Sequence, residues 1–404
     1  MIAWDAQFAQ RTSRMAASEI RELLKLLDNP EIISFAGGIP DPSLFPLAEI
    51  RASYDSILSN TERASAALQY SISEGYVPLR EWLVGYMASL GVTCDIDNII
   101  ITNGSQQALD FLGKLFLNPG DRVLVARPTY LGALQAFNCY EPTYGYFGEK
   151  ASVAKSETSP AKLAYVMPDF QNPSGISLDL EERNAFLDLA HQAGVPLIED
   201  AAYEKLRYDG SDLPPLLALE AERVGGIDKG QVIYCGTFSK TIVPALRLGW
   251  VVAPRAVISK LVLIKQASDL HCPTLNQMVM HEVASTTLLA NIDRIRDSYR
   301  ARRDAMLTAL ERDMPEGVTW TRPQGGMFIW ATLPPELNSA EVLRRAIADA
   351  KVAFVPGAAF FADGSGRNTL RLSFSRTDPA TVDIGIRRLG GLLTTLIAEA
   401  RAAA

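Results

Sequence analysis

The sequence has few of the residues from which metal sites and disulfide frameworks are built. It contains three histidines and four cysteines in 404 residues. His271 and His281 have no carboxylate motif between them, so we expect no metal site. None of the cysteines forms a CxxC pair. Reduced thiols and a cytoplasmic location are therefore expected, in place of a secreted, disulfide-linked protein.

The chain also lacks a surplus of basic residues and a long apolar run. Lys and Arg number 39 against 46 Asp and Glu, a formal net charge of -7, whereas nucleic acids and anionic membranes attract basic surfaces. No uninterrupted apolar segment is long enough to cross a bilayer. The start, MIAWDAQFAQRTSR, lacks the pattern of a signal peptide. We expect neither a nucleic-acid nor a membrane partner.

What the sequence does contain is an alternation of short apolar runs and helical patterns, which is typical of a mostly parallel sheet wrapped by helices. Hydrophobic residues make up 48% and charged residues 21%, as in ordinary globular proteins. Strands are predicted at 99–102, 122–126, 163–167, 196–199, 232–235 and 249–253. Helices are predicted at 106–117, 180–193 and 256–267.

A second region begins near residue 291 with a long charged helix. Its arginines alternate with aspartates, which predicts a solvated helix face. The arginines are Arg294, Arg296, Arg300, Arg302 and Arg303. Strands at 326–333, 352–355 and 369–374 and helices at 339–350 and 379–397 follow. We predict a large α/β domain at 46–295 and a smaller α+β domain at 1–45 and 296–404, with an N-terminal helix around 18–27 and a loop at 149–160.

Polar residues follow several predicted strands, and ligands of open α/β sheets bind at the carboxyl ends of the strands. In ITNGSQQAL, Ser105 and Gln106 open a helix whose free N–H groups suit a phosphate, although an ordinary serine N-cap fits equally. In YVMPDFQNPSG, Asn172 either initiates a turn or donates to an oxygen on a bound ring.

The strand in VPLIEDAAYEKL runs directly into Glu199 and Asp200. A carboxylate at the end of a buried strand needs a strong donor or a cation. Either a helix N-terminus or the protonated nitrogen of a pyridine ring satisfies that need, and the second arrangement keeps the ring cationic so that it accepts carbanion electrons. Tyr203, three residues on, is a candidate donor to the phenolic oxygen of such a ring.

Two cationic residues complete the pattern. In VIYCGTFSKTIVPALRLGW, a strand ends near Lys240, and a buried lysine amine forms Schiff bases with carbonyl compounds. The neighbouring hydroxyls and Arg247 are candidate phosphate ligands. In NTLRLSFS, Arg371 interrupts an apolar strand, so it needs an anionic partner: an internal carboxylate or the α-carboxylate of a substrate.

Taken together, these motifs resemble those of fold-type I, pyridoxal-5'-phosphate (PLP)-dependent aminotransferases of class I/II. The similarity is greatest to the group containing 2-aminoadipate and kynurenine aminotransferases, and it extends over nearly the whole chain. It implies an aspartate aminotransferase-like fold, with a mostly parallel seven-stranded sheet in the large domain. The matching segments include ASEIRELLKLL, ISFAGGIPDPSLFP, LQYSISEGYVPLR, DLHCPTLNQ, RPQGGMFIW and FVPGAAFF, besides the strand-end motifs above.

The resemblance implies a role for each matching residue. Lys240 is implied as the Schiff-base lysine, Asp200 as the partner of the pyridine nitrogen, and Tyr203 and Asn172 as donors to the phenolic oxygen. Tyr130 would stack on the ring, and Tyr70 would reach the phosphate of a neighbouring subunit in a homodimer with shared sites. The substrate carboxylate would be held by Arg371, Asn172 and the backbone at Gly38. The implied phosphate ligands are Ser105, Gln106, Thr237, Ser239 and Arg247, with Thr237 standing where serine is commoner.

The implied activity is ping-pong transfer of an amino group from an L-amino acid to a 2-oxo acid such as 2-oxoglutarate or pyruvate. The amino acids implied are 2-aminoadipate, glutamate and aromatic or branched-chain residues. Arg21, in the predicted N-terminal lid helix, would bind the acidic side chain of a substrate or else lie at the surface. A PLP-dependent lyase and a ligand-sensing regulator are the alternatives, and the second requires a DNA-binding domain for which the residues before ISFAGG leave little room.

Overall fold

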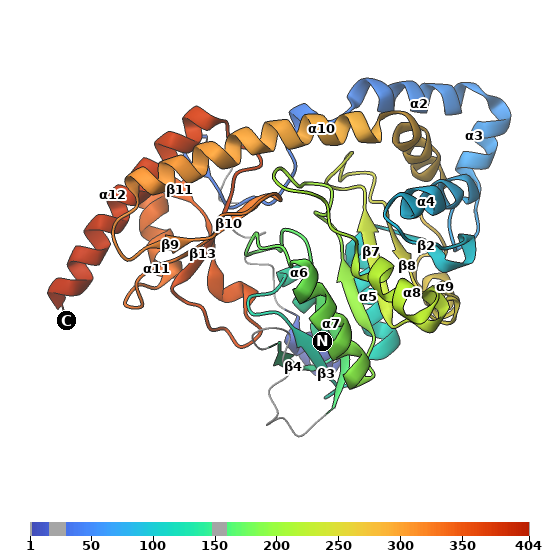
Figure 1. The fold of residues 1–404 in the computed structure, drawn as a ribbon, viewed down its shortest axis with the longest axis horizontal. Coiled ribbons are helices and arrows are strands. Elements are labelled where there is room, and N and C mark those ends of the chain that lie inside the picture. Colours follow the sequence, from blue (N-terminus) through green and yellow to red (C-terminus); the bar gives the residue numbers. More distant parts are fainter. Residues whose placement is uncertain (1, 16–29, 148–159, 404) are drawn as a thin grey trace.

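A computed structural model of the 404-residue chain describes residues 2–15, 30–147 and 160–403 (Figure 1). The predicted helix at 18–27 and nearly all of the predicted loop at 149–160 lie outside the described residues. Short 3₁₀ turns occur at Trp4–Ala6, Gln10–Arg14, Pro42–Leu44, Ile96–Asn98, Ile227–Lys229 and Gly357–Phe360.

Within the described residues, seven strands form the large sheet in the order β2-β8-β7-β6-β5-β3-β4. Neighbours from β7 to β4 are parallel, and β8 runs antiparallel to both of its neighbours. The mostly parallel seven-stranded sheet is therefore confirmed. The strands are β2 Ile99–Thr102, β3 Arg122–Val125, β4 Thr143–Tyr146, β5 Ala161–Val166, β6 Leu197–Asp200, β7 Val232–Thr237 and β8 Gly249–Val252.

Helices cover both faces of this sheet because its strands are apolar on both faces. Alternate strand residues point to opposite sides: Ile100 lies in one apolar core, and Ile99 and Ile101 lie in the other. The first core is closed by α5 Ser105–Phe116, α6 Leu131–Asn138 and α9 Arg255–Ser268. The second is closed by α4 Val77–Ser89, α7 Leu180–Ala193, α8 Leu216–Val224 and the start of α10, Thr274–Asp313.

A second, smaller layer lies at the far end of the 40-residue helix α10, Thr274–Asp313 (Figure 1). Its described strands form a sheet in the order β12-β13-β10-β9, and β1 pairs with β11 beside it. The strands are β1 Ile33–Ser34, β9 Thr319–Trp320, β10 Phe328–Thr332, β11 Val352–Ala353, β12 Val355–Pro356 and β13 Thr369–Ser373. The remaining helices are α2 Leu47–Ser59, α3 Thr61–Leu68, α11 Ser339–Arg345 (continued by a π-helical turn, Ala346–Ala350) and α12 Pro379–Ala403.

The structure corrects the prediction made for the arginines of α10. We expected a solvated helix face, but Arg303 is only 5% exposed. It pairs with Asp209 and donates to the Pro323 carbonyl, while Arg302 pairs with Asp41. The interleaved aspartates are exposed, as is Arg294, whereas Arg296, Arg300 and Arg302 are half-buried and each donates to one backbone carbonyl.

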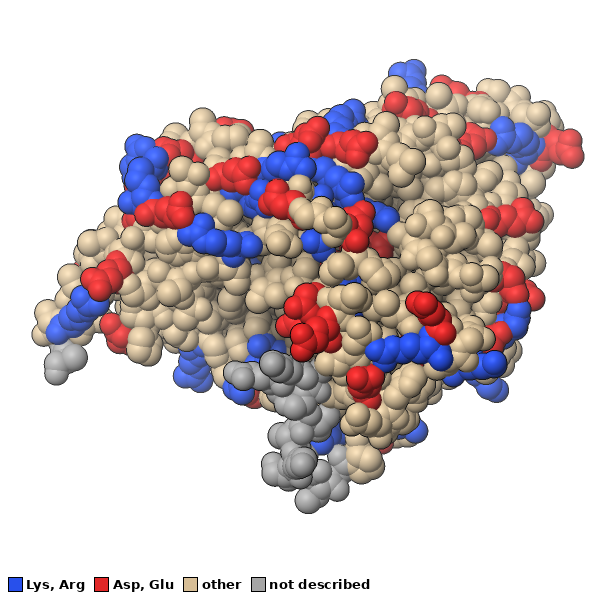
Figure 2. All heavy atoms as spheres, viewed as in Figure 1, with Lys and Arg blue, Asp and Glu red and all other residues tan. Residues whose placement is uncertain are grey.

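Charges of both signs are interspersed on the face shown in Figure 2. None of the described helices is long and apolar enough to span a membrane. The described residues also contain no group of three or more His, Cys, Asp or Glu side chains close enough to hold a metal ion.

Candidate active site

The candidate site lies at the carboxyl ends of neighbouring strands. Asn172 follows β5, Asp200 ends β6, and Lys240 follows β7. Since β5, β6 and β7 are parallel neighbours, their ends meet at one edge of the sheet. Arg371 comes from β13 of the smaller sheet and reaches Asn172, so both sheets contribute to one site.

Glu199 and Asp200 are both buried, and each meets a different partner. The two Glu199 oxygens accept the N–H groups of Leu216 and Leu217, at 2.7 and 2.9 Å, at the start of α8. Asp200 Oδ2 accepts the Tyr165 hydroxyl at 2.8 Å, but its Oδ1 has no hydrogen-bond partner among the described residues. A helix N-terminus thus stabilises Glu199, and one Asp200 oxygen is left for an external donor.

Burial raises the pKa of Asp200 to about 6, against the opposing effects of the Tyr165 hydroxyl, the Ala202 backbone N–H and the charge of Lys240. A cation next to the unpartnered oxygen would reverse that rise, because an opposite charge favours the carboxylate. This is the environment that a protonated pyridine nitrogen requires.

Lys240 has the electrostatic surroundings of a reactive amine. Burial lowers its pKa to about 8, with further lowering contributions from the positive charges of Arg371 and Arg247. Its Nζ donates to the Gly38 carbonyl at 3.4 Å and lies 5.9 Å from the centre of the Tyr203 ring. A larger fraction of this amine is neutral near pH 8 than in an ordinary lysine, as a nucleophile requires.

Arg371 is 1% exposed and forms no ion pair with a carboxylate among the described residues. Its guanidinium donates to Asn172 Oδ1 at 2.7 Å and to the Ala36 carbonyl at 2.9 Å, while Nε has no partner there. The group lies 4.3 Å from the ring centre of Phe328 and 5.1 Å from that of Phe360. Burial lowers the pKa of Arg371 to about 10. Such a buried charge needs an anion.

The aromatic and amide side chains converge on the same space. Tyr203 is buried beside Phe328, and burial raises its pKa while a hydrogen bond from Asn172 opposes the rise. The Tyr130 ring lies over Gly132 so closely that a Cβ at Gly132 would come within 2.6 Å of it. Gly38 is equally confined: a Cβ there would meet Phe328 at 2.7 Å and Arg371 at 3.6 Å.

The predicted phosphate ligands gather at the start of α5. Gly104, with φ +79°, caps the helix, and a Cβ on it would come within 2.4 Å of the Arg247 guanidinium. Thr237 donates to Ser239 Oγ at 2.9 Å and accepts the Ser239 N–H at 3.1 Å. Helix N–H groups without intrahelical partners, hydroxyls and an arginine make an anion site. One N–H of the Gln106 side-chain amide donates to the Gly132 carbonyl at 2.8 Å.

Of the remaining predicted residues, one lies apart from this cluster and one lies outside the described residues. Tyr70 is 79% exposed and contacts His271 edge-on, with ring centres 5.9 Å apart. Arg21 lies outside the described residues. Sequence reasoning also missed Tyr165, the Asp200 partner, although a hydroxyl on an otherwise apolar strand end was a usable signal.

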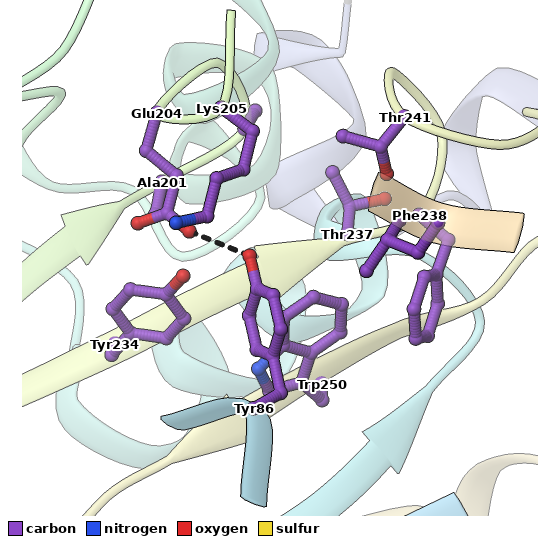
Figure 3. A pocket seen from close by; sticks show the side chains of 11 residues that line it. Tyr86, Ala201, Glu204, Lys205, Tyr234, Thr237, Phe238, Thr241 and Trp250 are labelled. Carbon is purple, nitrogen blue, oxygen red and sulfur yellow. Dashed lines mark hydrogen bonds between the residues drawn. The ribbon is translucent and has the colours of Figure 1, made fainter. Parts of the chain in front are cut away.

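A second, small cavity lies beside the strand ends, with Thr237 among its lining residues (Figure 3). In it, Tyr86 donates to Glu204 at 2.9 Å, and burial raises the pKa of Glu204. Neither Lys240 nor Arg371 lines this cavity, so it is distinct from the candidate site.

Comparison with known proteins agrees with this geometry. The family model for aminotransferases of class I and II matches residues 48–389. The 2-aminoadipate transaminase of Thermus thermophilus is 42% identical, with 98% of this chain and 99% of that protein covered. The aromatic-amino-acid aminotransferase 1 of Thermococcus litoralis is 40% identical, with 96% and 94% covered.

Among solved structures, the alpha-aminoadipate aminotransferase of Thermus thermophilus, in complex with N-(5'-phosphopyridoxyl)-L-leucine, superimposes with a TM-score of 0.89. It is 40% identical, and the match covers 98% of this chain and 100% of that one. The lysine, the unpartnered aspartate oxygen and the anion site described above fit PLP. The chain therefore belongs to the class I and II aminotransferases, as a PLP-dependent transaminase of fold type I.

Proposed function

We propose that the residues gathered at the strand ends bind PLP and an amino acid, and that the buried Arg371 holds the α-carboxylate of that amino acid. The observation that carries this proposal is a buried guanidinium without a carboxylate partner among the described residues, contacting Asn172 beside Lys240. PLP, when bound, supplies the electron sink for the Cα electrons of the substrate.

Lys240 is proposed to hold the cofactor covalently and, once released by the substrate, to move the proton between the substrate Cα and the C4' carbon of the cofactor. The amine needs to be neutral to accept that proton. The lowered pKa of Lys240, about 8, supports this role. Because the cofactor would carry the amino group from the donor to the acceptor, the proposed cycle is ping-pong.

The other roles follow from charge and hydrogen bonding. Asp200 would pair with the protonated ring nitrogen through its unpartnered Oδ1. Tyr203 and Asn172 would donate to the phenolic oxygen, and Tyr130 would stack on the ring. The phosphate ligands proposed are the α5 N-terminus at Ser105 and Gln106, together with Thr237, Ser239 and Arg247. Arg371, Asn172 and the Gly38 backbone would hold the substrate carboxylate.

For the substrates, we propose an L-amino acid that is acidic, aromatic or branched-chain as donor, and 2-oxoglutarate or pyruvate as acceptor. The names of the similar proteins, 2-aminoadipate transaminase and aromatic-amino-acid aminotransferase, support this range. Arg21 is proposed to read an acidic side chain from the N-terminal lid helix.

At the level of the whole chain, we propose a cytoplasmic homodimer in which Tyr70 completes the phosphate site of the partner subunit. The exposure of Tyr70 in the single chain supports this. We also propose a large domain at 46–295 and a small domain at 1–45 and 296–404. The described residues of α10 continue across that boundary without a break.

Replacing Arg371 tests the proposed carboxylate site. Arg371→Gln removes charge-assisted hydrogen bonds to the substrate, so kcat/KM is expected to fall about 100-fold or more, a loss of about 2.7 kcal/mol. The PLP absorption band should be retained. Arg80→Gln is the matched control, because Arg80 is also buried but donates, within the described part of the chain, to the carbonyls of Ile96 and Ile99 only. Equal losses of kcat/KM in both variants would contradict the proposal.

A further inference from the structure

Two loops carry the proposed donors to the phenolic oxygen. Asn172 lies in the turn 168–175 after β5, and Tyr203 lies in the loop 201–212 after β6. Both side chains must be placed to within a few tenths of an ångström to bind one oxygen atom. Since the two loops leave different strands, the placement depends on contacts that join them.

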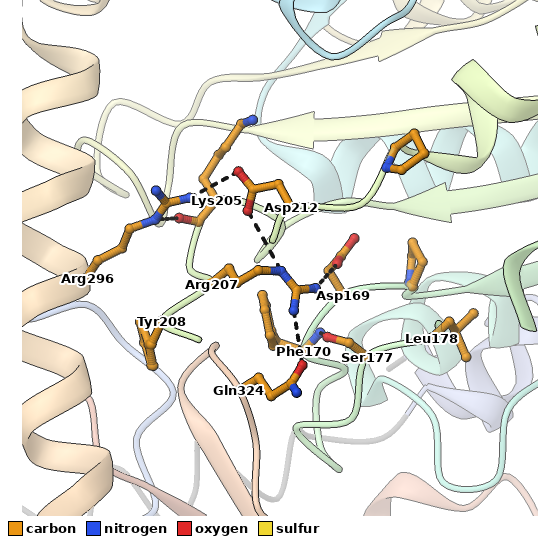
Figure 4. Close-up of polar contacts among 12 residues, drawn as sticks. Asp169, Phe170, Ser177, Leu178, Lys205, Arg207, Tyr208, Asp212, Arg296 and Gln324 are labelled. Atoms are coloured by element: carbon orange, nitrogen blue, oxygen red, sulfur yellow. Dashed lines mark hydrogen bonds and ion pairs between the residues drawn. The ribbon is translucent and has the colours of Figure 1, made fainter. Parts of the chain in front are cut away.

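Asp169 provides such a contact. It is 6% exposed, and its Oδ1 accepts a hydrogen bond from Arg183 at 2.7 Å. The same oxygen accepts a second hydrogen bond from Arg207 at 3.2 Å (Figure 4). Arg183 belongs to α7, whereas Arg207 belongs to the loop of Tyr203. Asp169 lies three residues before Asn172, and Arg207 lies four residues after Tyr203. The ion pair thus bridges the two loops close to both donors.

Arg207 is fixed by more than this pair. Its Nη1 donates to Gln324 at 3.2 Å, and its guanidinium lies 4.8 Å from the ring centre of Phe170, next to Asp169 (Figure 4). Its Nε lies 3.7 Å from Asp212. A planar group held on several sides has little freedom to move, so it transmits its position to the backbone on which it stands.

The loop of Tyr203 is held from its other side by α10. Arg296 donates to the Lys205 carbonyl at 2.7 Å, and Arg300 donates to the Tyr208 carbonyl at 2.7 Å. These hydrogen bonds hold the backbone around Arg207 against α10. The ion pair between Asp169 and Arg207 then ties the Asn172 turn to the same backbone.

We propose that Asp169 and Arg207 are positioning residues, which hold the side chains of Asn172 and Tyr203 within hydrogen-bonding distance of the phenolic oxygen of the cofactor. This inference rests on the proposed roles of those two donors. Neither Asp169 nor Arg207 is proposed to touch the cofactor, so both act through the backbone of their loops. Breaking a buried pair also leaves a charge without its partner, which displaces the loop that carries it.

The placement of these two donors affects the absorption of the bound cofactor. Hydrogen bonds to the phenolic oxygen favour its anionic form, so they lower the pKa at which the absorption of the bound cofactor changes. Donors that are displaced from the phenolic oxygen lower that pKa less. A purely structural ion pair changes thermal stability without moving the pKa of the chromophore.

The experiment compares holoenzyme variants by pH titration of cofactor absorbance without substrate, by kcat and KM, and by melting temperature. Asp169→Asn and Arg207→Met remove the pair, and Arg207→Lys retains the charge. Glu220→Gln is the matched control: Glu220 is a buried carboxylate that accepts hydrogen bonds from the backbone at Gln231 and Val232, in neither loop.

We expect D169N and R207M to raise the chromophore pKa by about half a pH unit or more and to lower kcat about tenfold, with a smaller change in KM. R207K should recover part of both effects, and E220Q should match the parent in both. Equal pKa values in all variants, or an equal shift in E220Q, would overturn the inference while leaving the proposed function intact. A parent holoenzyme without the absorption band of bound PLP would overturn the proposed function, and this inference with it.

Discussion

Two adjacent carboxylates at the end of β6 show how burial assigns different tasks to neighbouring residues. Glu199 is bonded to the start of α8, and Asp200 keeps one oxygen without a partner among the described residues. Because alternate residues of a strand point to opposite faces, the two side chains meet opposite layers of the protein. Only Asp200 is on the side of the site.

Asp200→Asn tests this division. The amide does not stabilise a protonated pyridine nitrogen as a carboxylate does, so the variant should bind PLP but lose about nine-tenths or more of its kcat. Steady-state kinetics with a saturating donor and acceptor measure this loss. Glu199→Gln is the control and should lower the melting temperature with kcat within about twofold of the parent. Near-normal turnover in Asp200→Asn would make Asp200 a structural residue.

Single site residues could be predicted from the sequence where a charged side chain stands in or directly after an apolar strand. A lysine, an aspartate and an arginine on apolar strands each required an unusual partner, and the structure brings Lys240, Asp200 and Arg371 to one place. Partners that are themselves apolar or backbone groups, such as Phe360 and the Ala36 carbonyl around Arg371, were not predictable. These groups contact Arg371 only because of where the fold places them, so their role could not be deduced from the sequence.

At the scale of elements, the sequence predicted most strands of the large sheet and missed several helices. The predicted bounds of β2 and α7 are those of the structure. The missed elements include β4, with 4 residues, and the helices α2, α3, α4, α6 and α8, with 13, 8, 13, 8 and 9 residues. Length alone does not separate the two groups, because β2 also has only 4 residues; β4 is held by pairing with β3 at the sheet edge.

The N-terminal segment ASEIRELLKLL is an element that only the sequence describes. Ile20, Leu23, Leu24 and Leu27 recur at helical spacing, which predicts an apolar stripe facing the protein with Arg21 beside it. If Arg21 points into the site, Arg21→Ala should lower kcat/KM for glutamate or 2-aminoadipate about tenfold or more, roughly 1.4 kcal/mol. Leucine and phenylalanine should be much less affected, and they serve as internal controls. Equal losses for both substrate classes would assign Arg21 to the fold of the helix.

At the scale of the whole molecule, the open question is whether two subunits share a site. Tyr70, which the family resemblance assigns to the cofactor site of a neighbouring subunit, is exposed at the surface. Aromatic side chains are enriched where a second subunit packs. The proposed homodimer with shared sites would account for the exposure of Tyr70.

Mixed dimers test the shared site. Lys240→Ala lacks the catalytic amine, and a strongly impaired Tyr70 variant lacks the residue contributed across the interface. In a hybrid of the two, one of the two sites contains both intact residues, so mixing the inactive variants should restore up to about a quarter of the parental activity if subunits exchange at random. Subunit exchange is verified with differently tagged chains. Confirmed exchange without recovered activity would contradict the shared site.

The most direct test of the central claim is the identity of the residue that binds PLP. The holoenzyme is reduced with borohydride, digested, and analysed by peptide mass spectrometry, with Lys240→Ala treated in parallel. The lowered pKa of Lys240 and its position after β7 predict that the reduced cofactor is attached to the peptide containing Lys240 and to no other. The variant should lack both the modified peptide and the reducible absorption band. Reduced cofactor on a different lysine of the parent enzyme would contradict the account.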